Sequence, residues 1–170
     1  MVQLTFAKIA SPIGELLLAC DNHAVQVLDY SDYHARMHQL LAHRYGHDGY
    51  ILVEKSDPLE AVSRIQAYFS GDLTACDNLP VDTGGTPFQQ QVWLALRDIP
   101  VGTAISYGTL AHRIGRPTAS RAVGRTNGLN PIAIILPCHR VVGSNNALTG
   151  YAGGLHRKEW LLRHEGWLAI

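Results

Sequence analysis

The sequence of 170 residues lacks the features that mark membrane, secreted and disordered proteins. No apolar stretch approaches the roughly 20 residues that a membrane-spanning helix needs, so we expect no membrane partner. The N-terminus has no basic flank followed by an apolar segment, so we expect no signal peptide. No internal repeat or low-complexity stretch is present. Only 16% of the residues are charged and 46% are hydrophobic, which predicts a globular protein with a buried core.

Cysteine is scarce, and the three cysteines stand at irregular spacing: Cys20, Cys76 and Cys138. An odd number does not make a disulfide framework and favours a reducing, cytoplasmic compartment. Two histidine pairs, His34/His38 and His43/His47, have the four-residue spacing that can bind metal. Neither pair has a thiol or carboxylate nearby that completes a set, and a solvated helix face explains both. We therefore predict no metal site and no cofactor.

The absence of net charge hides a division between the two halves of the chain. Residues 1–85 contain five Lys and Arg against eleven Asp and Glu, a net charge of −6. Residues 86–170 contain nine against three, a net charge of +6. Such asymmetry favours an anionic partner that docks on the C-terminal half. Chance segregation that lets the two halves attract each other is the alternative.

Residues 1–80 predict a small α/β domain. Its expected elements are strands at 3–10, 15–20 and 25–30, a helix at 31–45, a strand at 50–53 and a helix at 57–69. Ser31 and Asp57 are expected to cap the two helices, and Pro58 suits the first turn of the second. Residues 72–85 carry turn formers without periodicity, so they are expected to lead into the second domain, residues 81–170.

The second domain is predicted to be mainly helical. Its expected elements are helices that begin at Thr86, Ser106 and Pro117, a strand at 132–136 and a final helix at 155–165. The two short helices joined by Gly115-Arg116-Pro117 form a helix-turn-helix pattern. The following strand and residues 139–151 are candidates for a wing.

Between Ile134 and Val142 the sequence contains Cys138 and His139, which follow an apolar stretch and Pro137. Pro137 restricts Leu136 to extended geometry and cannot donate to a sheet, so a buried strand is expected to end here. Cys138 would then stand at the strand end, where side chains point towards a pocket. A thiol followed by an imidazole indicates an activated thiolate. A bare Cys-His pair is more often a structural cysteine beside a surface histidine, so that alternative stays open.

The helix predicted over residues 118–128 is the candidate recognition helix. Its exposed positions carry small residues except for Arg121 and Arg125, which are four apart and so share one face. Small residues let a helix approach DNA closely, and the arginines are free to reach phosphates or bases. Tight helix packing with solvated arginines explains the same pattern, so DNA binding is a hypothesis at this point.

Six short blocks follow one another along the second half: Ile105-Ser106-Tyr107, Ser120-Arg121-Ala122-Val123-Gly124, Asn130-Pro131, Pro137-Cys138-His139-Arg140-Val141, Tyr151-Ala152-Gly153-Gly154 and Lys158-Glu159-Trp160-Leu161-Leu162. In this order they resemble the O6-alkylguanine-DNA alkyltransferases, also called methylated-DNA–protein-cysteine methyltransferases. The resemblance is close over residues 86–167. Residues 1–70 agree more loosely, through the turn Ser11-Pro12-Ile13-Gly14 and the strand pattern.

The resemblance implies catalytic roles for five residues. Cys138 would be the nucleophile that takes the alkyl group from guanine O6 and keeps it as a thioether. His139 would act as the base for the thiol through an ordered water, because neighbouring side chains of an extended chain point apart. Glu165 would orient His139, and Asn130 would hold the turn that bears Cys138. Tyr107 would hydrogen-bond the leaving base at N3 and crowd the target phosphate.

The same resemblance implies how DNA is bound. Arg121 would fill the space left by a base that rotates out of the duplex, with its helix in the minor groove. The carbonyls of Cys138 and Val141 would read the guanine amino group, and the amide of Ala152 would face O6. The other residues expected at the DNA or the base are Tyr151, Ser120 and Arg125.

The sequence therefore predicts an α/β fold in two parts. The N-terminal part is a ribonuclease H-like domain with a small antiparallel sheet and helices, and the C-terminal part is a winged helix-turn-helix domain. The expected function is direct, irreversible and stoichiometric transfer of the alkyl group from O6-alkylguanine in double-stranded DNA to Cys138, by a monomer. The alternatives are a non-catalytic damaged-DNA binding protein and a cysteine hydrolase. The sequence leaves open the range of alkyl groups, the repair of O4-methylthymine and cooperative binding along DNA. It also leaves open whether the N-terminal domain binds zinc, because Cys20 and His23 lie in the first turns, where some members of the family that the sequence resembles bind a structural zinc.

Overall fold

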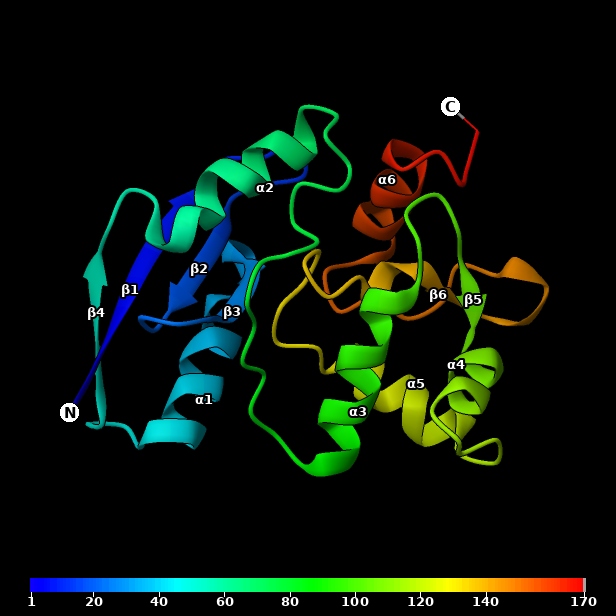
Figure 1. Ribbon diagram of the computed structural model, residues 1–170, viewed down its shortest axis with the longest axis horizontal. Helices are drawn as coiled ribbons and strands as arrows, with labels where there is room; N and C mark the ends of the chain where they lie inside the picture. The colour runs from blue at the N-terminus through cyan, green and yellow to red at the C-terminus, as the bar shows by residue number, and fades with distance from the viewer. Residues whose placement is uncertain (170) are drawn as a thin grey trace. The chain divides into compact units, whose positions relative to one another are not determined.

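The computed structural model describes residues 1–169 and divides the chain into two compact units (Figure 1). The first unit contains residues 1–84 and a return of the chain at residues 131–135. The second unit contains residues 85–130 and the chain from residue 136 onward. The predicted α/β fold in two parts is confirmed. No helix among residues 1–169 is both long and apolar enough to cross a lipid bilayer.

The first unit is built on a four-stranded sheet with the order β3-β2-β1-β4. Its strands are β1 (Val2–Ile9), β2 (Leu16–Cys20), β3 (Val25–Tyr30) and β4 (Tyr50–Glu54). The first three strands form the expected antiparallel meander, but β4 pairs with β1 in parallel. The sheet is therefore mixed rather than wholly antiparallel, because helix α1 (His34–Tyr45) carries the chain back between β3 and β4.

Both helices of the first unit start later than predicted, because a 3-10 turn precedes each of them. α1 follows the turn Ser31–Tyr33 and has no side-chain cap, so the predicted cap by Ser31 is wrong. α2 (Ala61–Phe69) follows the turn Pro58–Glu60. Asp57 accepts a hydrogen bond of 3.1 Å from the Ser63 amide in the first turn of α2, so it stabilises this helix from upstream.

The core of the first unit forms where α1 lies on one face of the sheet. Met37 and Leu41 of α1 join four buried strand residues in one cluster: Leu4, Leu17, Ala19 and Val27. Leu17 and Ala19 are two apart in β2 and Leu4 lies on the neighbouring strand, so the alternation of the strands supplies one apolar face. This burial of apolar side chains holds the sheet and α1 together.

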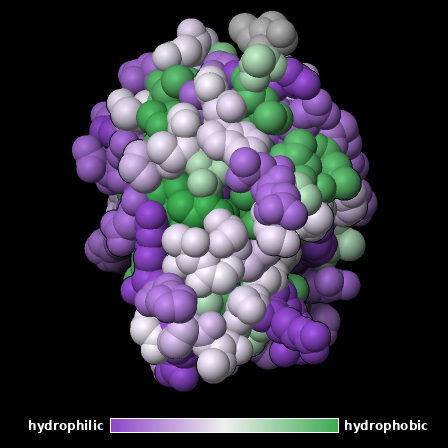
Figure 2. All heavy atoms as spheres, turned by 90° about the vertical axis from the view of Figure 1, so that its right-hand side faces the viewer, coloured by the Kyte–Doolittle hydropathy of each residue, from purple (hydrophilic) through white to green (hydrophobic). Residues whose placement is uncertain are grey.

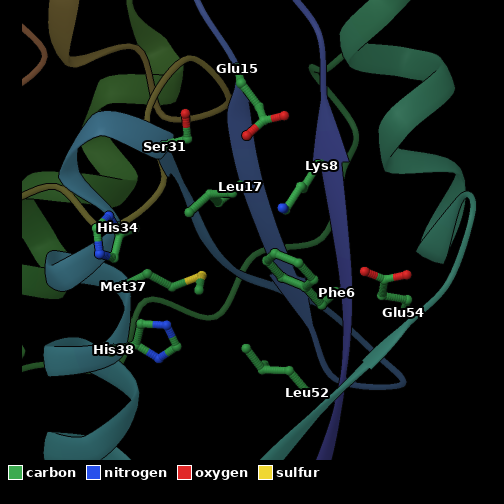
Figure 3. Close-up of a pocket in the computed structure, with 10 residues that line it drawn as sticks. All are labelled: Phe6, Lys8, Glu15, Leu17, Ser31, His34, Met37, His38, Leu52 and Glu54. Atoms are coloured by element: carbon green, nitrogen blue, oxygen red, sulfur yellow. The ribbon is translucent and has the colours of Figure 1, made fainter.

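A cavity of about 530 Å³ hollows the same face beside α1 (Figure 3). Phe6 and Leu17 form its floor, and His34 of α1 lies across the hollow from Lys8. All of its charged side chains are exposed, whereas its buried lining residues are the apolar Leu17 and Met37. A ligand site needs buried polar groups that orient the ligand, and this lining has none. None of the predicted site residues lines the cavity.

The second unit consists mainly of helices, with one short pair of parallel strands. These elements are α3 (Pro87–Ala95), α4 (Tyr107–Arg113), α5 (Ser120–Gly128), α6 (Leu155–His164), β5 (Ile105–Ser106) and β6 (Val141–Val142). Thr86 caps α3 by accepting from the Gln89 amide at 3.2 Å, and the Gln89 side chain completes a capping box. Ser106 caps α4 by accepting from the Thr109 amide at 3.0 Å. Both helix starts agree with the prediction.

The helix-turn-helix pattern is formed by α4 and α5, which lie side by side in the second unit (Figure 1). Gly115, with φ of +75°, ends α4 in the left-handed conformation that glycine adopts without strain. α5 begins at Ser120 rather than at Pro117. The reason is that residues 116–119 form a turn in which the Ala119 amide donates to the Arg116 carbonyl at 3.0 Å.

Candidate active site

The segment that carries Cys138 is buried, but the predicted strand at 132–136 is wrong. This segment pairs with β3 only at one bridge, between Leu28 and Ile132. The Ile135 amide then donates to the Ala133 carbonyl at 2.8 Å, which closes a three-residue turn around Ile134. Ile134 has φ of +71°, a conformation that β-branched residues rarely adopt. The chain therefore reverses at Ile134 instead of running straight into Pro137.

Two asparagine side chains hold the peptide groups around the cysteine. Cys138 opens a 3-10 helix, Cys138–Arg140, so the extended geometry expected at Cys138-His139 is wrong. Asn130 Nδ2 donates to the Leu136 carbonyl at 2.7 Å, and Asn127 Nδ2 donates to the Cys138 carbonyl at 3.2 Å. Cys138 itself is buried. The nucleophile candidate thus sits on a short turn whose carbonyls are fixed from both sides.

His139 and Arg140 share one buried carboxylate, Glu165. His139 Nε2 lies 2.7 Å from Glu165 Oε2, and Arg140 Nε donates to Glu165 Oε1 at 2.8 Å. Burial opposes ionisation of Glu165, but the charges and hydrogen bonds of His139 and Arg140 outweigh it, so the pKa of this carboxyl lies well below its usual range. His139 Nδ1 is buried and has no hydrogen-bond partner among the described residues. The histidine is therefore oriented at one nitrogen and available at the other.

Arg140 also reaches a backbone carbonyl, at Ile99. Its Nη1 donates to the Ile99 carbonyl oxygen at 2.7 Å, while its Nη2 donates to Glu165 Oε2 at 3.1 Å. The Arg140 guanidinium therefore links the turn at Cys138 to Glu165 and to Ile99, which follows the short 3-10 turn after α3. The family resemblance implies no separate role for Arg140. Two features point to a role for Arg140: its position two residues after Cys138 and its ion pair with the buried Glu165.

Lys158 begins the last of the six sequence blocks. The structure buries it completely in α6, where Nζ donates to the Val141 carbonyl at 2.6 Å and to the Thr149 carbonyl at 2.7 Å. Burial lowers the pKa of Lys158 to about 8, and the nearby Cys138 opposes part of that shift. Leu161 and Leu162 are buried three and four residues later in the same helix, and that spacing is the signal that places Lys158 inside.

Tyr107 shares the Thr149 carbonyl with Lys158. Its hydroxyl donates to that oxygen at 3.2 Å, from the first position of α4. Gly124 of α5 faces the ring, and a Cβ at this position would lie 3.5 Å from ring atom Cδ1 of Tyr107, an ordinary van der Waals contact. Burial raises the pKa of Tyr107, the hydrogen bond to Thr149 opposes the rise, and the charge of Cys138 adds to it. Tyr107, Lys158 and Cys138 therefore interact electrostatically.

The residues expected at the DNA or the base are exposed or half-buried in the second unit, except Val141. Arg121 and Arg125 are exposed on α5, and Ser120 is its half-buried first residue. Tyr151 is half-buried and Ala152 exposed, in a turn that the Gly154 amide closes by donating to the Tyr151 carbonyl at 2.9 Å. Val141 is buried in β6. Figure 2 faces the β5 and α4 side of this unit and shows apolar side chains in the middle with hydrophilic ones along both flanks.

Metal ligands are not assembled anywhere in the described chain. Among residues 1–169, no group of three or more His, Cys, Asp and Glu side chains is arranged to hold a metal ion. The histidines of α1 that have metal-binding spacing are exposed, and His38 Nδ1 instead lies 3.2 Å from the Tyr50 hydroxyl. The buried charged side chains near Cys138 include Lys158, Arg140 and Glu165.

The fold and the site together define a class of protein in which a helix-turn-helix and a buried cysteine share one unit. Two family models match the chain. The ribonuclease-like domain of 6-O-methylguanine DNA methyltransferase matches residues 4–83, and the DNA binding domain of the same family matches residues 87–167. The chain therefore belongs to the 6-O-methylguanine DNA methyltransferase family, which confirms the resemblance found in the sequence.

Individual relatives match over nearly the whole chain. A methylated-DNA–protein-cysteine methyltransferase of Salmonella typhimurium is 50% identical over 171 residues, which cover 100% of both chains. One of Methanosarcina acetivorans is 43% identical over 161 residues, 95% of this chain and 97% of that protein. The crystal structure of Mycobacterium tuberculosis OGT in complex with DNA has a TM-score of 0.80 and 42% identity, and the match covers 97% of this chain and 93% of that one.

Proposed function

We propose that this protein repairs DNA by transferring the alkyl group of O6-alkylguanine to Cys138. Membership of the family supports the reaction, alkyl transfer from O6-methylguanine in DNA to a cysteine. The observation that carries the choice of Cys138 is its position beside the buried His139–Glu165 pair, in the unit that also contains the helix-turn-helix. A thiol next to an oriented base is the arrangement that nucleophilic catalysis requires.

The transfer is a single displacement at the alkyl carbon. The sulfur of Cys138 forms a bond to that carbon while the bond from the carbon to guanine O6 breaks. The electron pair of the broken bond leaves with the guanine, which takes up a proton at N3 from Tyr107. His139 takes up the thiol proton, and after the transfer a proton passes from His139 to Tyr107 by way of solvent. The net change exchanges alkyl and hydrogen between base and sulfur. The product is a thioether, which water does not cleave, and each molecule reacts once.

His139 is the proposed acceptor of the thiol proton. Its Nε2 is engaged with Glu165 at 2.7 Å, so Nδ1 is the nitrogen that takes the proton, through an ordered water. Glu165 carries a negative charge because Arg140 and His139 keep its pKa low, and this charge stabilises the imidazolium that forms.

Base access is the second requirement, because O6 is stacked inside the duplex. We infer that α5 enters the minor groove and that Arg121, exposed on this helix, fills the gap left by the rotated nucleotide. Arg125 and Ser120 would contact the backbone, and Tyr151 and Ala152 would face the base. Asn127 and the Val141 amide already donate to the Cys138 carbonyl, which has two lone pairs. The Val141 carbonyl is therefore the better acceptor for the guanine amino group.

A titration with excess substrate tests the proposal. The monomeric protein is incubated with a duplex that contains one O6-methylguanine, and the repaired duplex is counted against protein molecules. The expected result is one repaired base per molecule, followed by a complete stop. Tight binding without repair would instead support a damage-binding protein, and continued turnover would support a hydrolase. Either result would contradict the proposed reaction.

A further inference from the structure

Two asparagines at the end of α5 donate to two backbone carbonyls, two residues apart, in the segment that contains Cys138. Asn130 follows the helix and reaches the Leu136 carbonyl, and Asn127 lies in its last turn and reaches the Cys138 carbonyl. The family resemblance implies a role for Asn130 only. Asn127 contacts the nucleophile's own peptide group, and it is 2% exposed. It is thus a buried polar residue that the proposed reaction does not yet use.

Packing alone does not explain an amide at position 127. Burying an amide costs free energy unless its hydrogen bonds are made, whereas an apolar side chain at the same place incurs no such cost. Asn127 Oδ1 is buried and has no hydrogen-bond partner among the described residues. The Asn127 side chain therefore makes its hydrogen bond to the Cys138 carbonyl through Nδ2, while its Oδ1 has no partner among the described residues. That bond is the feature that distinguishes asparagine from an apolar residue here.

We propose that Asn127 is a positioning residue for alkyl transfer, which sets the direction of the Cys138 thiol by holding the carbonyl of the same residue. This inference rests on the proposed function. The Cys138 carbonyl also accepts from the Val141 amide, which follows the 3-10 helix, so Asn127 supplies a second donor from another element of the chain. Two donors on one oxygen prevent rotation of the peptide plane. Displacement at carbon requires sulfur, carbon and O6 in line, so such rotation would slow the reaction.

Stoichiometric transfer offers a readout that separates positioning from folding. The number of repaired bases counts the folded, reactive molecules, while the single-turnover rate constant at saturating duplex reports the geometry of those molecules. For Asn127→Ala we expect a rate constant lower by about tenfold, since small displacements of reacting groups cost factors of this size or more. We expect the dissociation constant for the duplex to stay within twofold of that of the unchanged protein.

Thr126→Ala is the matched control. Thr126 precedes Asn127 in α5 and is similarly buried at 6% exposed, and its backbone carbonyl, which accepts from Trp93 Nε1, survives the change. The control should keep the original rate constant. Equal rate constants for the two alanine variants would overturn the role of Asn127, even if both variants were less stable.

Asn127→Asp tests the donor directly. Aspartate matches asparagine in volume but turns a carboxylate towards the Cys138 carbonyl, so the rate constant per reactive molecule should fall at least as far as in Asn127→Ala. A rate constant near that of the unchanged protein would show that shape is sufficient and would overturn the inference. Failure of the unchanged protein to transfer any methyl group would instead contradict the proposed function, so the two failures are distinguishable.

Discussion

Cys20 and Cys138 are both buried cysteines, one in each unit, and their surroundings differ sharply. Cys20 ends β2 in the sheet, where burial raises the pKa of its thiol to about 12 and the neighbouring Asp21 adds to the rise. Cys138 lies close enough to Lys158 to raise the pKa of that residue against the effect of burial, and it precedes His139 and its Glu165 partner. Burial by itself therefore keeps a thiol protonated and inert. We propose that Cys138 differs because charged groups, among them Lys158, lie near it.

The same contrast extends to the buried side chains of the two units as a whole. Eight buried side chains of the described residues are polar or charged, and only Gln26 belongs to the first unit. The other seven are Thr126, Asn127, His139, Arg140, Arg157, Lys158 and Glu165. Buried charges are costly and are therefore concentrated where chemistry needs them. The first unit is organised for packing and the second for a reaction.

Replacing each of the two cysteines in turn gives the largest expected difference in methyl transfer. Cys138→Ser should abolish methyl transfer, because the hydroxyl oxygen is a far weaker nucleophile than a thiolate. Cys20→Ala should repair one base per molecule at the original rate, since its thiol is protonated and lies in the sheet. Transfer to labelled O6-methylguanine duplex measures both. Loss of methyl transfer in a folded Cys20→Ala variant would contradict the view that Cys20 takes no part in the reaction.

Removing the buried carboxylate tests the charge network of the second unit. Glu165→Gln should lower the free energy of unfolding at pH 7 by about 3–5 kcal/mol, because it leaves the Arg140 guanidinium buried without its partner. The low pKa of Glu165 means that this stability is present above the ordinary carboxyl pKa near 4.5 and is lost as the pH falls below it. The difference between variant and unchanged protein should therefore shrink on acidification.

Asp29→Asn in the first unit is the comparison for that variant. Asp29 pairs with Arg36, whose side chain is 34% exposed, so solvent screens the pair and about 1 kcal/mol or less should be lost. Urea unfolding at pH 7 and at pH 4 measures both variants. Equal losses would mean that the network around Glu165 is no more important than a surface ion pair.

Lys158→Met tests whether the buried ammonium promotes reaction of Cys138. Loss of the positive charge should lower the thiolate fraction and, with it, the single-turnover rate constant at pH 7 by about tenfold. Burial lowers the pKa of Lys158 to about 8, so the charge is present below that pH and is lost as the pH rises through it. The unchanged protein should show a decline of the rate constant in this range, and the variant should not. Parallel pH profiles would exclude a role for the charge.

The smallest effects are expected at the helix starts. Thr86→Ala removes a capping box from α3 and should cost about 1 kcal/mol of unfolding free energy. Ser31→Ala should change it by only a few tenths, because Ser31 makes no cap in the first unit. Thermal unfolding of the two variants under the same conditions checks the difference. A loss at Ser31 as large as that at Thr86 would contradict the described start of α1.

Local signals in the sequence explain which elements were predictable. Thr86 and Ser106 cap helices through bonds to residues three positions away, and Gly115 ends α4 through its own backbone freedom. Such features depend on neighbours in the chain, so the sequence contains all the information they need. The ordered motifs around Tyr107 and Cys138 made the family recognisable in the same way.

Features that depend on distant partners were not predictable. The chain reversal at Ile134 occurs in an apolar run that has every local property of a strand, and Ala133 at this turn donates to Leu28, far away in sequence. The burial of Lys158 depends on the Val141 and Thr149 carbonyls that fold over it. Asn127 shows no local sign that its amide meets the Cys138 carbonyl. Tertiary contacts override local preference at all of these positions.

The most direct test of the central claim is to locate the methyl group among the three cysteines of one protein molecule. After reaction with an O6-methylguanine duplex, the protein is digested and the peptides that contain Cys20, Cys76 and Cys138 are analysed by mass spectrometry. We expect one methyl group on the Cys138 peptide and none on the Cys20 and Cys76 peptides. A methyl group on the Cys20 or Cys76 peptide, or unmodified Cys138 after repair, would contradict this expectation.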